Sequence, residues 1–289
     1  INNGLVGLAT YWPSLRIVAE ELSREGDRRE EGGGSPSLKR QLKVDGVSFS
    51  HKKSRSFKLQ KVNLEIEKGS FVGIVGPSGC GKSTLIDVIL GFYVADDGKV
   101  VIDDRELSLL RRDKWLGMIG YAGQETFILS GTLVDNIVFS TNKDIDSHRL
   151  DRAIQVTGLG ELLEDWPDGI ETRIGEGGLD LSGGQRQRLS IARAVYRDPD
   201  LYIFDEATSN LDSKSENELQ LKIGKICKDG GKTIIAVSHR LSIFTNADMI
   251  YVMDKGRIVE KGTHLDLMKL RGIYQHFYHQ QLRIEPPAD

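Results

Sequence analysis

The chain has 289 residues, and its 39 Lys and Arg nearly balance its 42 Asp and Glu, giving a formal net charge of -3. This balance excludes a polybasic nucleic-acid-binding protein, so we expect no nucleic-acid partner, and the 39% of hydrophobic residues describes a soluble globular body. Cys80 and Cys227 are the only cysteines, too few for a disulfide framework or a four-cysteine zinc site.

The first 41 residues are predicted to form two parts. Residues 5–12 are apolar and residues 15–22 continue at helical spacing, but this stretch is shorter than the ~20 residues of a membrane span. Residues 1–22 are therefore either an N-terminal helix on the domain or the tail of a membrane helix. Residues 23–41 mix dense charge with glycine and serine, which predicts a flexible linker, so the folded body should start near Leu42.

A phosphate-binding loop is the first motif of the body. Residues 71–75 form a short apolar run typical of a buried strand, G-x-x-x-x-G-K-S follows it, and residues 85–91 then have a helical pattern. Glycines allow backbone N–H groups to turn toward phosphate oxygens, and the helix start adds its dipole. Lys82 would reach the β- and γ-phosphates, and the Ser83 hydroxyl would bind Mg²⁺. The predicted phosphate-binding residues are Gly76, Ser78, Gly79, Cys80, Gly81, Lys82, Ser83 and Thr84.

Cys80 has two interpretations. Its position before a helix would lower the pKa of a thiol and make it reactive, or its side chain would simply fill a small space.

Two carboxylates follow a second buried-strand run. Strands are predicted at residues 71–75, 118–122, 201–204 and 233–238, and the first and third of these are apolar runs typical of buried strands. The third of these ends in Asp205 and Glu206, where parallel sheets place their ligands. Asp205 suits a Mg²⁺ ligand and Glu206 a base that polarises the attacking water. The alternative is that one of them only caps the next turn.

A second helix start with free N–H groups lies at residues 181–185, LSGGQ. Ser182 and Gln185 have the spacing of a capping box, which alone explains them structurally. Gly183 and Gly184, however, disfavour a helix and expose N–H groups to an anion. Two separate anion-binding helix starts suggest a nucleotide bound from two sides.

These motifs, with Gln124, residues 209–212 and His239, occur in the order of a known family. From about Leu42 to Tyr278 the chain resembles the nucleotide-binding domain of ABC (ATP-binding cassette) transporters. The resemblance implies an α/β fold: a P-loop NTPase core of the ABC ATPase type, with an antiparallel β subdomain and an inserted α-helical subdomain. It implies a domain over residues 42–282, a helical subdomain at about 125–197 and a disordered tail at 283–289.

The resemblance also implies roles for single residues. Gln124 would sense Mg²⁺ and connect the site to the membrane part. Residues 182–185, namely Ser182, Gly183, Gly184 and Gln185, would bind the γ-phosphate of ATP held by a second nucleotide-binding domain. Asp212 would lie across that dimer interface. His239 would contact the γ-phosphate and hold the attacking water beside Glu206.

One position departs from the family pattern. Many members place an aromatic residue, often tyrosine, after a strand such as residues 47–50, where it stacks on adenine; here that residue is His51. An imidazole can also stack, although over less area, and Phe57 is a nearby substitute. We expect the cofactors ATP and Mg²⁺.

Three stretches are similar to exporters: residues 127–137, residues 174–178 before LSGGQ, and residues 260–264. The similarity favours a membrane-helix tail at residues 1–22 and implies a fused transmembrane domain. The nucleotide-binding domain would then lie on the cytoplasmic face of an inner or plasma membrane. The second nucleotide-binding domain would be an identical chain or a paralogue. Phe127 and Ile128 are expected either to receive a helix of the membrane part or to be ordinary core residues.

Two alternatives to an exporter stay open. One is the separate ATPase subunit of an ABC importer, and the other is a soluble ABC ATPase or regulator.

Overall fold

The computed structural model describes residues 36–51, 58–139, 145–208 and 213–282. The predictions for residues 1–35, Phe57, Asp212 and residues 283–289 fall outside these ranges. In the ranges that are described, no helix combines the length and the apolar character needed to cross a membrane.

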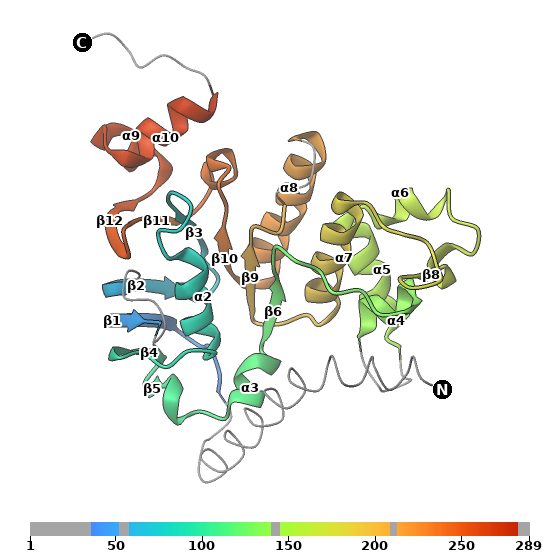
Figure 1. The fold of residues 1–289 in the computed structure, drawn as a ribbon, viewed down its shortest axis with the longest axis horizontal. Helices are drawn as coiled ribbons and strands as arrows, with labels where there is room; N and C mark the ends of the chain where they lie inside the picture. The colour runs from blue at the N-terminus through green and yellow to red at the C-terminus, as the bar shows by residue number, and fades with distance from the viewer. Residues whose placement is uncertain (1–35, 52–57, 140–144, 209–212, 283–289) are drawn as a thin grey trace, which may run out of the picture.

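A six-stranded sheet runs through the middle of the molecule in the order β12-β11-β3-β10-β9-β6 (Figure 1). Its neighbours pair in parallel except β12, which is antiparallel to β11. Its strands are β3 (Phe71–Val75), β6 (Ile119–Ala122), β9 (Leu201–Asp205), β10 (Thr233–Val237), β11 (Met249–Asp254) and β12 (Arg257–Gly262). Every residue of β9 and β10 is buried, as expected of parallel strands covered on both faces. All four predicted strands are confirmed, with ends that differ by no more than one residue.

The second sheet is antiparallel and has the order β2-β1-β4-β5. Its strands are β1 (Gln41–Ser50), β2 (Lys58–Glu67), β4 (Asp97–Ile102) and β5 (Arg105–Glu106). Helix α2 (Lys82–Leu90) shares one hydrophobic core with this sheet and with the strands of the central sheet. The Tyr251 hydroxyl joins the two sheets, because it accepts from Glu65 N and donates to Glu65 O, both at 2.9 Å.

The packed body begins before the predicted boundary at Leu42. Leu38 is only 2% exposed and belongs to the core. The Asp103 carboxylate accepts the backbone N–H groups of Lys39, Arg40 and Gln41 at 2.8–3.0 Å. Residues 38–41 are therefore part of the folded body rather than of the linker.

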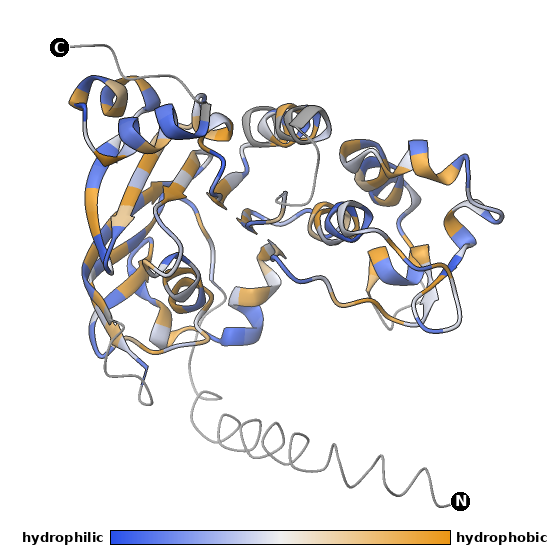
Figure 2. Ribbon diagram, turned by 45° about the horizontal axis from the view of Figure 1, so that its top comes forward, coloured by the Kyte–Doolittle hydropathy of each residue, from blue (hydrophilic) through white to orange (hydrophobic). Residues whose placement is uncertain are grey.

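Helices α4 to α7 form a group of their own on the right of Figure 1, where α5 and α4 both pack against α7. This group contains α4 (Leu133–Val138), α5 (Ser147–Thr157), α6 (Leu159–Leu163), α7 (Gly183–Tyr196), η2 (Gly169–Glu171), β7 (Gly131–Thr132) and β8 (Arg173–Ile174). The other described helices are η1 (Leu107–Leu109), α3 (Arg112–Gly117), α8 (Ser213–Gly230), η3 (Leu241–Phe244), α9 (His264–Leu270) and α10 (Ile273–Leu282). Figure 2 shows the central strands as mostly hydrophobic and the surrounding helices as two-coloured, which agrees with one buried and one exposed helix face. The fold combines the predicted parallel core, the antiparallel β subdomain and a helical group.

Candidate nucleotide site

The phosphate loop, residues 76–84, connects β3 to α2 at the carboxyl edge of the central sheet. Gly76 has φ 154°, and a Cβ there would lie 2.2 Å from Met253 O. Gly81, the N-cap of α2, has φ 114° and no side-chain cap bonds to the helix. Only glycine adopts these conformations without strain, and the first turn of α2 is left without a side-chain partner for its N–H groups.

Lys82 extends into the curve of this loop. Its ammonium donates to Gly76 O at 3.0 Å and to Pro77 O at 3.1 Å, and the residue is 5% exposed. A buried cation whose hydrogen-bond partners among the described residues are neutral carbonyls is an attractive partner for phosphate, because an anion adds charge-assisted hydrogen bonds.

Cys80 is buried beneath the loop, and burial raises the pKa of its thiol, although the nearby Lys82 charge opposes this. A raised pKa makes the thiolate scarce, so the reactive-thiol interpretation is wrong and the thiol fills space.

Asp205 ends β9 next to the phosphate loop. Burial raises the pKa of its carboxyl most strongly, whereas a hydrogen bond from Ser83 lowers it and the Glu206 charge raises it further. Its Oδ1 is buried and has no hydrogen-bond partner among the described residues. A carboxylate with a free oxygen beside a hydroxyl fits a hard cation such as Mg²⁺, which prefers oxygen ligands.

Glu206 turns away from Asp205 and meets His239, which lies just beyond the end of the neighbouring strand β10. Glu206 Oε1 lies 2.6 Å from His239 Nε2. The backbone of Glu206 has φ 54°, in the left-handed region, and its N–H donates to Val237 O at 2.9 Å. A non-glycine residue in this conformation is uncommon, and such residues are frequent at functional sites. The two adjacent acids therefore have separate surroundings.

A pocket of about 190 Å³ lies between the phosphate loop and the His239 segment, lined by Gly76, Pro77, Ser238 and His239 among others. Gln281 of α10 also lines it. The Gln281 side chain accepts Leu241 N at 2.9 Å and donates to His239 O. The last described helix thus supports the histidine segment.

Gln124 follows β6, the strand beside β9, and is exposed. Since Ala122 pairs with Phe204, Gln124 leaves the sheet at the same edge as Asp205. The two candidate Mg²⁺ side chains thus come from neighbouring strand ends.

LSGGQ lies apart from this edge, at the start of α7 in the helical group (Figure 1). The predicted capping box is present, because Ser182 Oγ accepts Gln185 N at 3.3 Å and Gln185 Oε1 accepts Ser182 N at 2.8 Å. Ser182 and Gly183 are exposed. Among the described residues, no hydrogen bond or ion pair joins LSGGQ to the phosphate loop of the same chain.

His51 packs edge-on against two aromatic rings, with centroids 4.9 Å from Phe49 and 5.1 Å from Tyr93. Phe49 and Tyr93 stack at 4.9 Å, and Tyr93 is 37% exposed. Sequence analysis missed Tyr93, whose position depends on the pairing of β1 with β4. The Phe92-Tyr93 pair directly after the α2 helix was the only hint in the sequence.

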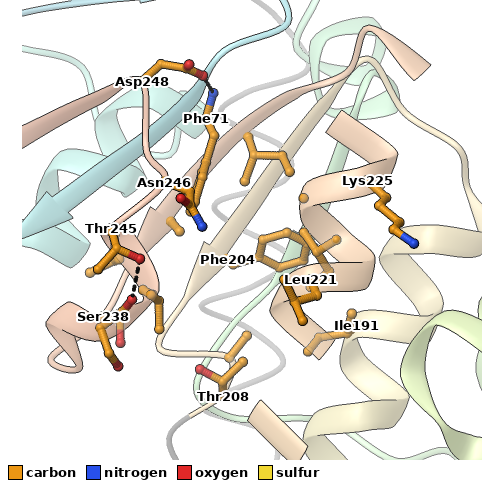
Figure 3. A pocket seen from close by; sticks show the side chains of 18 of the residues that line it. Phe71, Ile191, Phe204, Thr208, Leu221, Lys225, Ser238, Thr245, Asn246 and Asp248 are labelled. Atoms are coloured by element: carbon orange, nitrogen blue, oxygen red, sulfur yellow. Dashed lines mark hydrogen bonds between the residues drawn. The ribbon is translucent and has the colours of Figure 1, made fainter. Parts of the chain in front are cut away.

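A larger and mostly apolar pocket of about 620 Å³ lies between α8 and the strands β9 and β10 (Figure 3). Phe204, Leu221 and Ile191 line it, together with Ala207 and Ser238, which are chain neighbours of Glu206 and His239. It lacks the glycine loop and the lysine of the phosphate site, so it is not the nucleotide pocket.

Comparisons with known proteins agree with this geometry. The family model described as ABC transporter matches residues 59–209, just over half of the chain. An ATP-dependent lipid A-core flippase of Coxiella burnetii is 35% identical over 98% of this chain and 47% of its own length. A leukotoxin export ATP-binding protein of Aggregatibacter actinomycetemcomitans is 36% identical over 96% of this chain and 40% of its own.

A solved structure of a bacterial Atm1-family ABC exporter with ATP bound superimposes with a TM-score of 0.82 at 29% identity. The match covers 97% of this chain and 49% of that one. The chain thus spans about half the length of the relatives it matches. The predicted family and fold class are confirmed: the chain belongs to the ABC transporter family.

Proposed function

We propose that this chain binds and hydrolyses Mg·ATP and powers export or flipping of a substrate through a transmembrane domain fused to it in the full-length protein. Family membership implies ATP binding. The relatives named above are a flippase and exporters, which supports export over the importer and soluble alternatives. The observation that carries the proposal is the contact between Glu206 and His239 beside a complete phosphate loop.

Binding relies on the loop backbone and Lys82. The N–H groups around Gly79 and Gly81 and the first turn of α2 surround the phosphates, while Ser78, Ser83 and Thr84 add hydroxyls. The Lys82 ammonium exchanges its carbonyl partners for β- and γ-phosphate oxygens. Adenine lies beside His51 in the ring cluster with Tyr93.

Hydrolysis uses Glu206 as the base. A water bound beside the Glu206–His239 pair attacks the γ-phosphorus, its proton passes to the Glu206 carboxylate, and the bond from γ-phosphorus to the bridging oxygen breaks, releasing ADP and phosphate. His239 orients the water and the γ-phosphate. Asp205, Ser83 and Gln124 would hold Mg²⁺, which when bound neutralises charge on the β- and γ-phosphates.

The start of α7 serves a second nucleotide-binding domain, either an identical chain or a paralogue. Residues 182–185 would bind the γ-phosphate of ATP in the partner's phosphate loop, so that two ATP molecules join two domains. Loss of the γ-phosphate by hydrolysis removes this bridge and lets the dimer open.

The surface that meets the membrane part is proposed around Phe127. Phe127 is 68% exposed and Leu129 36%, so Phe127 is no core residue, whereas Ile128 packs against the core. Ser130 Oγ donates to Glu176 O at 3.0 Å, which joins the segment after Gln124 to the exporter-like segment before LSGGQ. This apolar and acidic surface would receive a helix of the fused domain at the cytoplasmic face of a membrane.

The test is Mg·ATP hydrolysis by the purified chain over a range of protein concentrations, with Glu206→Gln as the control. We expect the rate per chain to rise with concentration, because each site needs two chains. Glu206→Gln should lower the rate by about 100- to 10,000-fold, as loss of a general base does, while ATP binding persists.

Two results would contradict the proposal. An unchanged rate in Glu206→Gln would show that Glu206 is not the catalytic base. A rate per chain that is constant at all concentrations would contradict a site built from two chains.

A further inference from the structure

We propose that Gln187 is a positioning residue for catalysis: it fixes the backbone of Glu206 and ties it to helix α7. The inference rests on the proposed function of Glu206 as base. Gln187 lies outside LSGGQ, on the same helix α7.

Gln187 is a buried amide on a helix whose buried residues are otherwise apolar except for Ser190. It is 1% exposed, and Leu189, Ile191 and Ala192 on the same helix are fully buried. Burying an amide costs free energy unless it is hydrogen-bonded, so an apolar residue of this size would serve packing better. A role in packing therefore does not account for glutamine here.

The amide is directed at the catalytic residue. Gln187 Nε2 donates to Glu206 O at 3.4 Å. The other backbone group of Glu206, its N–H, is bonded to Val237 O at 2.9 Å. Both backbone polar groups of Glu206 are thus occupied, one by the central sheet and one by α7.

This restraint matters because Glu206 has a conformation that its backbone does not favour. Its φ of 54° is left-handed, and a residue with a Cβ keeps such a conformation only when its surroundings impose it. The same conformation directs Oε1 to His239 Nε2 at 2.6 Å. Without Gln187, the peptide after Glu206 would be free to rotate, and the carboxylate would leave the histidine.

The hydrogen bond from Gln187 also links the position of helix α7 to that of the catalytic base Glu206. Helix α7 begins at the capping box of Ser182, which we propose to contact the partner's ATP. A shift of α7 on nucleotide binding in the partner site reaches the Glu206 carbonyl through one side chain. Hydrolysis in one site should therefore depend on occupancy of the other.

The test compares Gln187→Met with Leu189→Met, a matched control that changes a buried residue of the same helix with no polar contact to Glu206. We expect Gln187→Met to lower kcat about 5- to 20-fold, leave KM and the Kd for ATP within twofold, and reduce the Hill coefficient toward 1. Leu189→Met should leave all four values within twofold.

Two further readouts separate positioning from packing. In the nucleotide-free chain, hydrogen exchange of the segment 201–208 should accelerate in Gln187→Met and not in Leu189→Met. In a Glu206→Gln background, Gln187→Met should cause no further loss of the residual rate, because a residue that acts through Glu206 is not additive with it. Gln187→Asn, whose amide is one methylene shorter, should repeat the split between kcat and KM if the methionine variant unfolds.

The outcomes are distinguishable. An inactive wild-type chain would overturn the proposed function and this inference with it. An active wild type with an unaltered kcat in Gln187→Met, equal losses in the two methionine variants, or additive losses with Glu206→Gln would overturn the inference alone.

Discussion

The starts of α2 and α7 are both rich in glycine, but side chains cap the backbone N–H groups only at α7. At α2, Gly81 is the N-cap and no side chain caps the helix, while Lys82, its first residue, is buried with its ammonium bonded to a loop carbonyl. At α7, Ser182 and Gln185 cap each other and stay at the surface. The start of α2 is suited to bind the phosphates of the nucleotide held by its own chain. The start of α7 is capped and needs no ligand.

The difference indicates which half of the site depends on another molecule. A helix start that stays stable when empty and exposed suits an encounter with a separate subunit, because nothing has to fold on contact. A buried lysine among neutral carbonyls has a strong preference for a bound phosphate. Substitutions at the two starts should consequently affect different steps.

The largest effect is expected for Lys82→Ala, which removes the cation of the phosphate loop. The Kd for ATP should rise roughly 100-fold, because charge-assisted contacts worth about 3 kcal/mol are lost. This Kd can be measured by fluorescence titration of the chain with a labelled ATP, at a chain concentration too low for pairing. Lys99→Ala, at an exposed position of β4, serves as the control and should bind normally; a normal Kd in Lys82→Ala would contradict the assignment.

A smaller effect is expected for Ser182→Ala. The Kd for ATP of the dilute chain should not change, whereas the rate at concentrations that allow pairing should fall about tenfold through the lost hydroxyl contact to phosphate. Unfolding should be easier by about 1 kcal/mol, since a cap is lost.

The control for Ser182→Ala is Thr263→Ala, which breaks the equivalent capping box of α9. It should cost similar stability and leave the rate unchanged. If Ser182→Ala weakens ATP binding by the dilute chain, the two helix starts belong to one site and the comparison fails.

The smallest effect is expected for the pH dependence of folding stability that Asp205 causes. Because burial raises its pKa above the ordinary 3.8, the folded chain binds the proton more tightly than the unfolded chain. Stability from this group is complete below pH 3.8 and is lost as pH rises through the folded-state pKa. Asp205→Asn should therefore raise the Tm of the nucleotide-free chain in chelator by about 2–4 °C at neutral pH and not in acid.

A thermal unfolding series from pH 3.5 to 8 checks this prediction. Asp103→Asn is a contrasting variant, because three backbone N–H groups outweigh burial and lower the pKa of that carboxyl. Loss of the Asp103 carboxylate in Asp103→Asn should destabilise the chain at neutral pH. A Tm difference for Asp205→Asn with no dependence on pH would contradict the electrostatic explanation.

Sequence reasoning succeeded where the signal is local. A buried strand followed by a glycine loop and a helix is written in consecutive residues, so the phosphate loop and the ends of β3, β9 and β10 were predictable. The capping box of α7 is equally local.

It failed where contacts join distant residues. Tyr93 meets His51 only because β1 and β4 pair, and Gln187 reaches Glu206 across 19 positions. Leu38 was hidden because a window of charged and small residues obscures a single apolar anchor. Such positions follow from tertiary packing, which local patterns do not encode.

The hydrogen bonds of Gln281 have a consequence for synthesis of the protein. His239 and Leu241 obtain these partners from a residue about 40 positions later in the chain. The ribosome makes the phosphate loop early, yet the histidine segment lacks its last support until α10 has emerged. A tag or truncation within α10 would therefore act as an active-site mutation.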